Sequence, residues 1–387
     1  MPKSGRMETL TDADQLARTA GERETFRSLP PREFSLVLTG DTSFGENYQA
    51  REEAKGRENV LKRRGYAYTM AKVAPILTES SLVIANLETV VTDIAQSPFA
   101  GSKGWVHWSD VRETPRQLLA HNIRAVSLAN NHSIDYGVDG LKQTVETLSA
   151  AGIANFGAGL NLAEARLPFS HEAEILSAGK RLHLRCFAAF AVDDSYEAKY
   201  QAYATAERPG TNPLAVADLA RDVRLAKSLD PNAFIVTILH WRRDYRWRSR
   251  QQKEAAQALL AAGSDLVIGH GSHMMQQIEK IEGRWVAHGL GNFVFNSPGR
   301  YEAMGVPPYS LVARLVFEEG ARPRHMRLYP IFTNNRATGY QTRFVSHEEF
   351  HEVYGLLLER SPEPKDFQAE IATGSDRFGH HLDVPLV

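Results

Sequence analysis

Residues 127–140 read SLANNHSIDYGVDG, and they indicate the fold class of this chain. The stretch begins inside an apolar, partly alternating run, IRAVSLA (123–129), which is typical of a buried β-strand. The run stops at residues 130–132, Asn-Asn-His, and a pattern typical of a helix follows over VDGLKQTVETLSAAG (138–152). A strand that ends in polar side chains and leads into a helix is the repeating unit of layered α/β proteins.

The same order of strand and helix recurs on both sides of this stretch. Strands are expected over 34–40, 81–88, 182–190, 233–241, 264–270, 284–295, 310–318 and 326–332. Helices are expected over 66–77, 115–122 and 251–263. The alternation predicts an α/β architecture.

Polar side chains suited to metal binding or acid–base chemistry follow five of the expected strands. They are Asp41, Asn86 with Glu88, Asn130 with Asn131 and His132, His240, and His270 with His273. In open α/β sheets, ligands bind in the crevice beyond the carboxyl ends of the strands. Carboxylates, amide oxygens and imidazoles suit Mg, Mn, Fe or Zn ions, and the set lacks the thiolates of structural zinc sites. The five strand ends together predict one ligand site.

Each of these residues also has an ordinary structural interpretation. Asp41 follows a glycine, which is typical of a turn or a helix cap. A lone histidine such as His240 is more often a hydrogen-bonded core residue than a ligand. The ligand-site hypothesis therefore depends on the coincidence of these groups at strand ends, not on any one of them.

The composition predicts a globular protein without a strong overall field. The 387 residues include 45 basic and 46 acidic ones, which give a formal net charge of -1. We therefore expect neither nucleic acid nor a membrane surface as a partner. Cys186 is the single cysteine, so an intramolecular disulfide framework is excluded. The amino terminus has charges throughout and no apolar core, which predicts no signal peptide or anchor and a cytoplasmic location.

Seven sequence blocks resemble the CapA proteins, which are named for poly-γ-glutamate capsule synthesis and are related to calcineurin-like metallophosphatases. The blocks are LTGDTSFGE, ANLETVVT, SLANNHSIDYGVDGLKQT, FGAGLNLAEA, ILHWRRDY, AAGSDLVIGHGSHMMQQIE and HGLGNFVF. The resemblance implies a four-layer α/β/β/α sandwich with a metal site at one edge of its two sheets. It also implies a metal-dependent catalytic domain over 31–345, after a polar extension (1–30) and before a C-terminal helix and tail (346–387).

The resemblance implies roles for individual residues by position. The implied metal ligands are Asp41, Glu88, Asn131, His240 and His273. Glu88 would take the place of a bridging carboxylate, and His132 that of the histidine that contacts the reacting group. The implied cofactor is one or two divalent ions among Mg, Mn, Ca, Fe and Zn.

The chain departs from the usual metallophosphatase pattern at two places. Such proteins usually begin with Asp-x-His, whereas GDTS (40–43) contains no histidine. Their late motif is usually Gly-His-x-His, whereas GHGSH (269–273) has one more residue between its histidines. With fewer ligands, a single ion or an asymmetric pair fits as well as a symmetric two-metal site.

An arginine-rich stretch, HWRRDYRWRSR (240–250), follows one of the strands. It is consistent with a solvated surface segment or with a clamp for a carboxylate or phosphate, because guanidinium groups match both anions. The expected substrate contacts are Trp241, Arg242 and Arg243 in this stretch, and Asn86 at the end of the strand expected over 81–88. The expected partner is a peptide or another carboxylate-bearing substrate.

CapA-like proteins include lasso-peptide epimerases, and inversion of configuration at Cα of a residue in such a precursor peptide is the reaction expected here. The proton-transfer candidates are His132 with His270 or His273, and Asp244 is a further one. The alternatives are phosphoester hydrolysis and amide chemistry on poly-γ-glutamate. A protein of another class, a metal-stabilised peptide-binding protein, is a further alternative.

Overall fold

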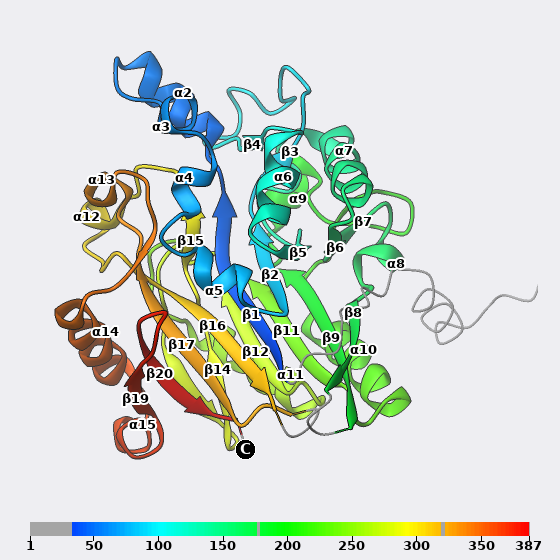
Figure 1. The fold of residues 1–387 in the computed structure, drawn as a ribbon. Helices are drawn as coiled ribbons and strands as arrows, with labels where there is room; N and C mark the ends of the chain where they lie inside the picture. The colour runs from blue at the N-terminus through cyan, green and yellow to red at the C-terminus, as the bar shows by residue number, and fades with distance from the viewer. Residues whose placement is uncertain (1–32, 176–178, 319–321, 387) are drawn as a thin grey trace, which may run out of the picture.

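The computed structural model describes residues 33–175, 179–318 and 322–386, and Figure 1 shows its two β-sheets with helices around them. The polar extension expected over 1–30 lies outside the described residues. The expected four-layer α/β/β/α architecture is confirmed, because each sheet packs against the other on one face and against helices on its outer face.

The first sheet combines parallel and antiparallel strands. Its order is β19 (Ala372–Ser375), β20 (His380–Pro385), β17 (His325–Phe332), β16 (Tyr309–Phe317), β1 (Phe34–Ser43), β2 (Leu82–Leu87), β5 (Ile123–Ser127) and β6 (Ala154–Phe156). β15 (Asn292–Phe295) pairs with β1, and β18 (Arg343–Phe344) pairs with β17. The strands β1, β2, β5 and β6 are parallel, so their carboxyl ends lie at the same edge.

The second sheet is built in the same way around a parallel centre. Its order is β13 (Ile278–Ile281), β14 (Arg284–Ala287), β12 (Leu266–His270), β11 (Phe234–His240), β9 (Lys180–Phe190) and β8 (Phe169–Ile175). The neighbours β9, β11, β12 and β14 are parallel. Two short ribbons join β3 (Val90–Val91) to β4 (Trp108–Ser109) and β7 (Ala158–Gly159) to β10 (Gly210–Thr211).

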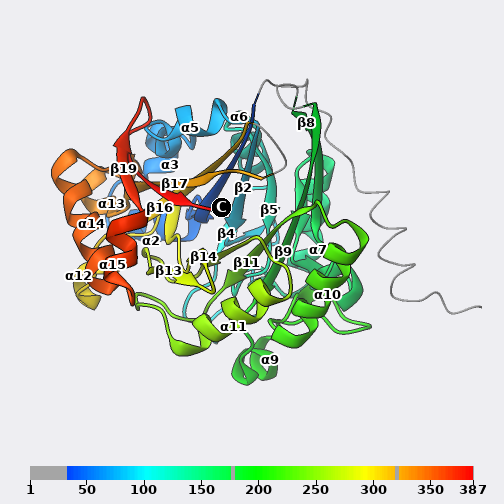
Figure 2. The ribbon, with the colours of Figure 1, turned by 90° about the horizontal axis from the view of Figure 1, so that it is seen from below.

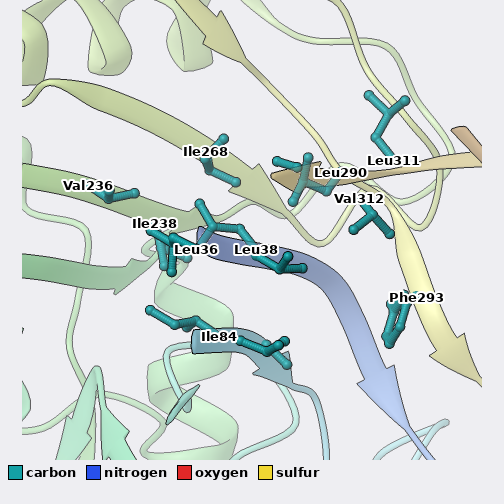
Figure 3. Close-up of a cluster of buried hydrophobic side chains, with 14 of the residues drawn as sticks. Leu36, Leu38, Ile84, Val236, Ile238, Ile268, Leu290, Phe293, Leu311 and Val312 are labelled. Carbon is teal, nitrogen blue, oxygen red and sulfur yellow. The ribbon is translucent and has the colours of Figure 1, made fainter. Parts of the chain in front are cut away.

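The main core lies between the two sheets. Figure 3 shows Leu36 and Leu38 of β1 and Ile84 of β2 opposite Val236 and Ile238 of β11. All five side chains are buried, and full burial of an aliphatic side chain of this size contributes about 1.5–3 kcal/mol. Burial of the inward-facing apolar residues therefore contributes strongly to the stability of the contact between the two sheets.

Alternation along the strands creates a second core on the outer face of the second sheet. Ile235 and Leu239 of β11 point away from the first sheet and pack with residues of α10 (Val216–Leu229) and α11 (Arg250–Ala261). Figure 2 shows α10 and α11 on this side of the sheets and α5 (Ala74–Thr78) on the opposite side.

The other helices surround the sheets and their loops. They are α2 (Glu46–Ala54), α3 (Val60–Arg64), α4 (Ala67–Met70), α6 (Glu113–Ala120), α7 (Gly137–Ala150), α8 (Leu162–Ala165), α9 (Asp194–Tyr200), α12 (Tyr301–Met304), α13 (Asn335–Thr338), α14 (His347–Arg360) and α15 (Pro364–Glu370).

Two expectations about single elements differ from the structure. The helix expected over 66–77 is divided into α4 and α5, and Pro75 lies at the start of α5, where its missing N–H is tolerated. The tail expected after the C-terminal helix instead forms α15 and the hairpin β19–β20, and β20 pairs with β17. Leu382 and Val384 alternate inward on β20, which explains why this polar segment adds a strand to the sheet.

Among residues 33–175, 179–318 and 322–386, no helix is both long and apolar enough to cross a bilayer. The cytoplasmic location stays a prediction.

Candidate metal centre and active site

The carboxyl ends of strands from both sheets meet at one edge of the molecule. Asp41 of β1 is in register with Asn86 of β2, and His240 of β11 is in register with His270 of β12. The two sheets are joined here by a contact of 3.2 Å between Asn86 Nδ2 and His240 Nδ1. The sequence predicts that polar residues from several strand ends form one cluster, and the geometry is consistent with this prediction.

Asn86 lies between two of the expected metal ligands. Its side-chain amide donates a hydrogen bond of 2.8 Å to Asp41 Oδ1, and its Oδ1 accepts one of 3.2 Å from Asn130. Asn86 is buried and does not line either cavity at this edge. The hydrogen bonds of Asn86 hold ligand side chains in place, and its role as a substrate contact stays a prediction.

Asn131 and His240 approach each other from different sheets. Asn131 Oδ1 lies 2.7 Å from His240 Nε2, so the oxygen and the nitrogen point at the same small region. The backbone carbonyl of Asn131 accepts a hydrogen bond of 2.7 Å from Lys103 Nζ, which holds the loop after β5 in position.

His273 reaches the cluster from a backbone conformation that is uncommon for histidine. Its φ is 57°, in the left-handed region, and its Nδ1 lies 3.6 Å from Asp41 Oδ2 and 2.9 Å from Asn292 Oδ1. The N–H of Gly271 donates to both oxygens of Asp41, at 3.2 Å each. Gly271 has a φ of 80°, and a Cβ there would come within 2.6 Å of His240 Nε2, so the turn requires glycine.

The carboxylate of Glu88 lies at the centre of the cluster. Its side chain is fully buried, and neither of its carboxylate oxygens has a hydrogen-bond partner among the described residues. Its Oε1 lies 3.8 Å from His132 Nε2 and 3.9 Å from His240 Nε2. Burial raises the pKa of Glu88 well above its usual value, and the charge of Asp41 raises it further.

The donor set around Glu88 fits a divalent metal ion. Ligand atoms of Asp41, Glu88 and His273 lie within 4.8 Å of one another, and His240 and Asn131 point at the same region. A buried carboxylate without a partner is unfavourable, and a cation beside it would remove this penalty. The mixture of carboxylate, amide oxygen and imidazole suits Mg, Mn, Fe or Zn. These five residues, all expected from the sequence, would hold the ion.

His132 is held by a carboxylate three residues later in the chain. Its Nδ1 lies 2.6 Å from Asp135 Oδ2, so this nitrogen carries the proton and Nε2 faces Glu88. Burial lowers the pKa of His132 well below its usual value, and the charges of Lys103 and His273 lower it further. A neutral imidazole with a defined tautomer is the form needed to accept a proton.

Three residues of this site were missed by the sequence analysis. Asp135 lies in the turn after β5, where it binds His132, Lys103 Nζ and, at 2.5 Å, the backbone N–H of His107. The ring of His107 stacks on that of His132 with centroids 3.4 Å apart, and its Nδ1 lies 3.1 Å from the backbone oxygen of Glu88. The His-x-x-Asp spacing of residues 132–135 was a usable signal for Asp135. Lys103 and His107 lie in the irregular segment between β3 and β4, and no sequence pattern indicated their role.

His270 lies away from the cavities, although it was a proton-transfer candidate. It is buried between the sheets, with Nε2 3.0 Å from the backbone oxygen of Thr39. It is absent from the walls of both cavities described below, so its position is unsuitable for proton transfer to a substrate. Of the late histidines, His273 lines a cavity instead.

Two adjoining cavities open at this edge. The histidine pocket, about 410 Å³, is lined by His107, His132, His273, Asn131, Tyr48, Trp105, Tyr196, Tyr200, Asp244, Tyr245, Phe295 and cationic residues that include Arg51, Lys55, Lys103, Arg300 and Arg336. The arginine pocket, about 450 Å³, is lined by Asn131, Tyr196, Trp241, Arg242, Arg243, Asp244, Arg246, Arg300 and Met304. Cations outnumber acids on both walls, so the two cavities favour an anionic ligand.

The side chains of the arginine-rich stretch that were expected to contact a substrate differ in how accessible they are from the cavities. Arg243 lines the arginine pocket, and its buried Nε has no hydrogen-bond partner within the described part of the chain. Arg242 forms an ion pair with Asp193 and lies over the ring of Tyr196. Trp241 is almost fully buried, and its indole N–H donates a 2.7 Å hydrogen bond to a backbone carbonyl, so it acts as part of the wall. Asp244 is exposed and borders both pockets.

Comparison with known proteins agrees with this architecture. Residues 35–297 match the family described as "Bacterial capsule synthesis protein PGA_cap". The chain is 27% identical over 267 residues to the capsule biosynthesis protein CapA of Bacillus anthracis, a match that covers 68% of this chain and 60% of that protein. It is 26% identical over 281 residues to the PGA biosynthesis protein CapA of Bacillus subtilis, covering 72% and 68%. It is 30% identical over 238 residues to a probable polyglutamine synthesis accessory protein of Mycobacterium tuberculosis, covering 59% and 58%.

Proposed function

The chain belongs to the bacterial capsule synthesis protein family PGA_cap, and on this premise we propose that it is a metal-dependent enzyme that cleaves an amide bond in an anionic, poly-γ-glutamate-like peptide. The names of two relatives refer to synthesis of PGA or of polyglutamine, which supports amide chemistry on such a chain better than epimerisation. The observation that carries the proposal is the position of the unpartnered Glu88 carboxylate and the neutral His132 beside cavities with cationic walls.

The cationic walls account for recognition of the substrate. Each glutamate unit of such a chain has one free carboxylate, and guanidinium groups bind carboxylates with paired, charge-assisted hydrogen bonds. Arg243, Arg246 and Arg300 line the arginine pocket and are in no ion pair with another described residue. We assign them to the carboxylates next to the reacting bond.

The reaction uses the neutral form of His132. When bound, a divalent ion at Asp41, Glu88, Asn131, His240 and His273 supplies Lewis acidity for the amide carbonyl and for water. The oxygen of water forms a bond to the carbonyl carbon, and His132 Nε2 accepts the proton. The C–N bond then breaks, and His132 returns the proton to the departing amine nitrogen. Asp135 holds the tautomer and stabilises the charged imidazole between these steps.

The test is chain shortening of poly-γ-glutamate. The protein is incubated with the polymer and Mn²⁺ or Zn²⁺, with EDTA in a parallel sample, and new amino termini and chain length are measured. New termini that require metal and disappear in Glu88→Gln support the proposal. Release of phosphate from an aryl phosphate without any cleavage of the polymer would replace it with phosphoester hydrolysis.

Epimerisation is a second candidate, because two imidazoles face one cavity. His132 follows a strand of the first sheet and His273 a strand of the second, and both line the histidine pocket. Two such groups would remove a Cα proton from one side and return one from the other. Incorporation of deuterium at Cα of a peptide in D2O, without hydrolysis, would favour this reaction. Tight binding without any reaction, unchanged in His132→Ala, would favour a binding protein.

A further inference from the structure

Three histidines lie together at the C-terminal part of the fold, apart from the residues that form the candidate active site. His347 and His351 are exposed and one turn apart on α14, and His380 is the first residue of β20. Figure 1 shows α14 beside the hairpin formed by β19 and β20, and Figure 2 shows the same arrangement from below.

The two histidines on α14 already have the separation of a chelating pair. His347 Nε2 and His351 Nε2 are 3.1 Å apart. Two nitrogens bound side by side to one ion are roughly 2.9–3.4 Å apart, because each metal–nitrogen bond is about 2.0–2.1 Å. At this separation only one of the two nitrogens can be protonated and donate a hydrogen bond to the other. At least one of them therefore has a free lone pair that faces its neighbour. An ion can therefore replace the shared proton with little movement.

A third histidine lies beside the pair, and its ring would have to turn to bring a nitrogen to the same ion. The ring centroids of His347 and His351 are 4.5 Å apart, and those of His347 and His380 are 5.2 Å apart. Two imidazoles on one ion have centroids roughly 4.5–5 Å apart, given the same bond lengths. The ring of His380 packs on that of Phe350 at 5.2 Å, which keeps it beside the helix.

The surrounding charges tolerate a cation. His347 is the first residue of α14, where the helix dipole is positive and disfavours a bound cation. Glu348 lies in the same first turn and Glu352 follows His351, so these two carboxylates offset the dipole, whereas Glu349 is paired with Arg343. Ser346 caps the helix together with Glu349, which fixes the turn that carries His347.

We propose that His347, His351 and His380 form a binding site for a late first-row divalent metal ion, with Zn²⁺ as the physiological candidate. Imidazole donors favour Zn, Ni and Cu over Mg and Ca, which prefer oxygen ligands. The bound ion links α14 to β20 and so fastens the C-terminal hairpin to the body of the protein. The site is independent of the proposed reaction, because none of its residues lines the histidine or the arginine pocket.

The test compares zinc binding in the intact protein and in variants that retain the candidate active site. The double variant His347→Gln/His351→Gln is expected to bind one zinc ion fewer per chain than the unaltered protein, by calorimetric titration and metal analysis. His380→Gln is expected to weaken the same binding step at least tenfold. His325→Gln removes an exposed histidine elsewhere on the surface and is expected to change neither quantity.

A second measurement separates metal binding from a purely structural role. Zinc is expected to raise the melting temperature of the unaltered protein, and the part of this shift due to the C-terminal site disappears in the double variant. Equal zinc stoichiometry in the double variant and the unaltered protein would overturn the proposal. So would a double variant that is destabilised equally with and without zinc.

Discussion

His132 Nδ1 lies 2.6 Å from Asp135 Oδ2, and this contact leaves His132 Nε2 directed at the buried carboxylate of Glu88. The two residues are three positions apart in a turn, so the geometry of one short segment determines both the tautomer and the orientation of the imidazole. Asp135 is itself held by Lys103 and by the N–H of His107. The orientation of His132 therefore depends on a loop far away in the sequence.

Replacement of Asp135 by asparagine is expected to reduce turnover by a factor of about 10²–10⁴, because a histidine in the wrong tautomer no longer accepts the proton. The change should lower kcat far more than it raises KM. Steady-state kinetics on poly-γ-glutamate check this, with the melting temperature as a control for folding. An unchanged kcat in a folded variant would contradict a role for Asp135 in positioning His132.

Replacement of Glu88 by glutamine is expected to have opposite effects on the metal-free and metal-bound proteins. Without metal, the variant should be more stable at neutral pH by about 1 kcal/mol, because a carboxyl group with a raised pKa must take up a proton or keep an unpaired buried charge, and the amide does neither. With metal, the variant should bind more weakly and gain less stability than the unaltered protein. Thermal unfolding with EDTA and with Mn²⁺ or Zn²⁺ measures both effects. Equal metal-induced stabilisation in the two proteins would show that Glu88 is not a ligand.

Replacement of Arg243 by glutamine is expected to raise KM for an anionic peptide about tenfold or more, since a hydrogen bond to a charged group contributes about 1.5–3 kcal/mol. The effect should shrink at high ionic strength. Arg250→Gln is the matched control, because Arg250 lies in the same stretch but has a side chain that is 89% exposed and paired with Glu254. Equal KM values for the two variants would argue against the arginine pocket as the carboxylate site.

The environment of Glu279 leads us to expect that the free energy of unfolding depends on pH. It is 1% exposed and meets Arg248 Nε at 2.7 Å, Lys253 Nζ at 2.5 Å and His288 Nε2 at 3.1 Å. Although burial opposes the charge, the hydrogen bonds of His288 and Lys253 and the charge of Arg248 lower the pKa of Glu279 to about 2. Its ordinary value is 4.5, so this stabilisation is complete above about pH 4.5 and is lost as the pH falls toward 2.

Glu279→Gln should remove this contribution, which amounts to about 2–3 kcal/mol. The free energy of unfolding, measured in urea between pH 2.5 and 6, should then depend less on pH than in the unaltered protein. Glu254→Gln, an exposed carboxylate on α11, is the control and should leave the profile nearly unchanged. A variant with the same pH dependence as the unaltered protein would contradict the assignment.

The alternation of apolar runs and helical segments was enough to predict the α/β class, because burial between two layers requires a regular pattern of side chains along each element. It was also enough to bring Asp41, Glu88, Asn131, His240 and His273 to one edge, since parallel strands end together. His132 was found in the same way. These residues lie in a strand or within a few residues of its carboxyl end, so their positions depend mainly on local structure and on strand direction.

Only the tertiary structure decided which polar residues face a cavity. Asn86 and His270 have the same sequence context as the candidate site residues that line a cavity, yet their side chains turn into the space between the sheets and find hydrogen-bond partners there. Lys103 and His107 come from an irregular loop, and their contacts with Asp135 arise from packing across the sheet edge. Strand periodicity specifies the face on which a side chain lies, but the path of a loop depends on contacts between segments far apart in the chain. For that reason the candidate ligands could be expected from the sequence, whereas the loop residues that hold Asp135 and His132 in place could not.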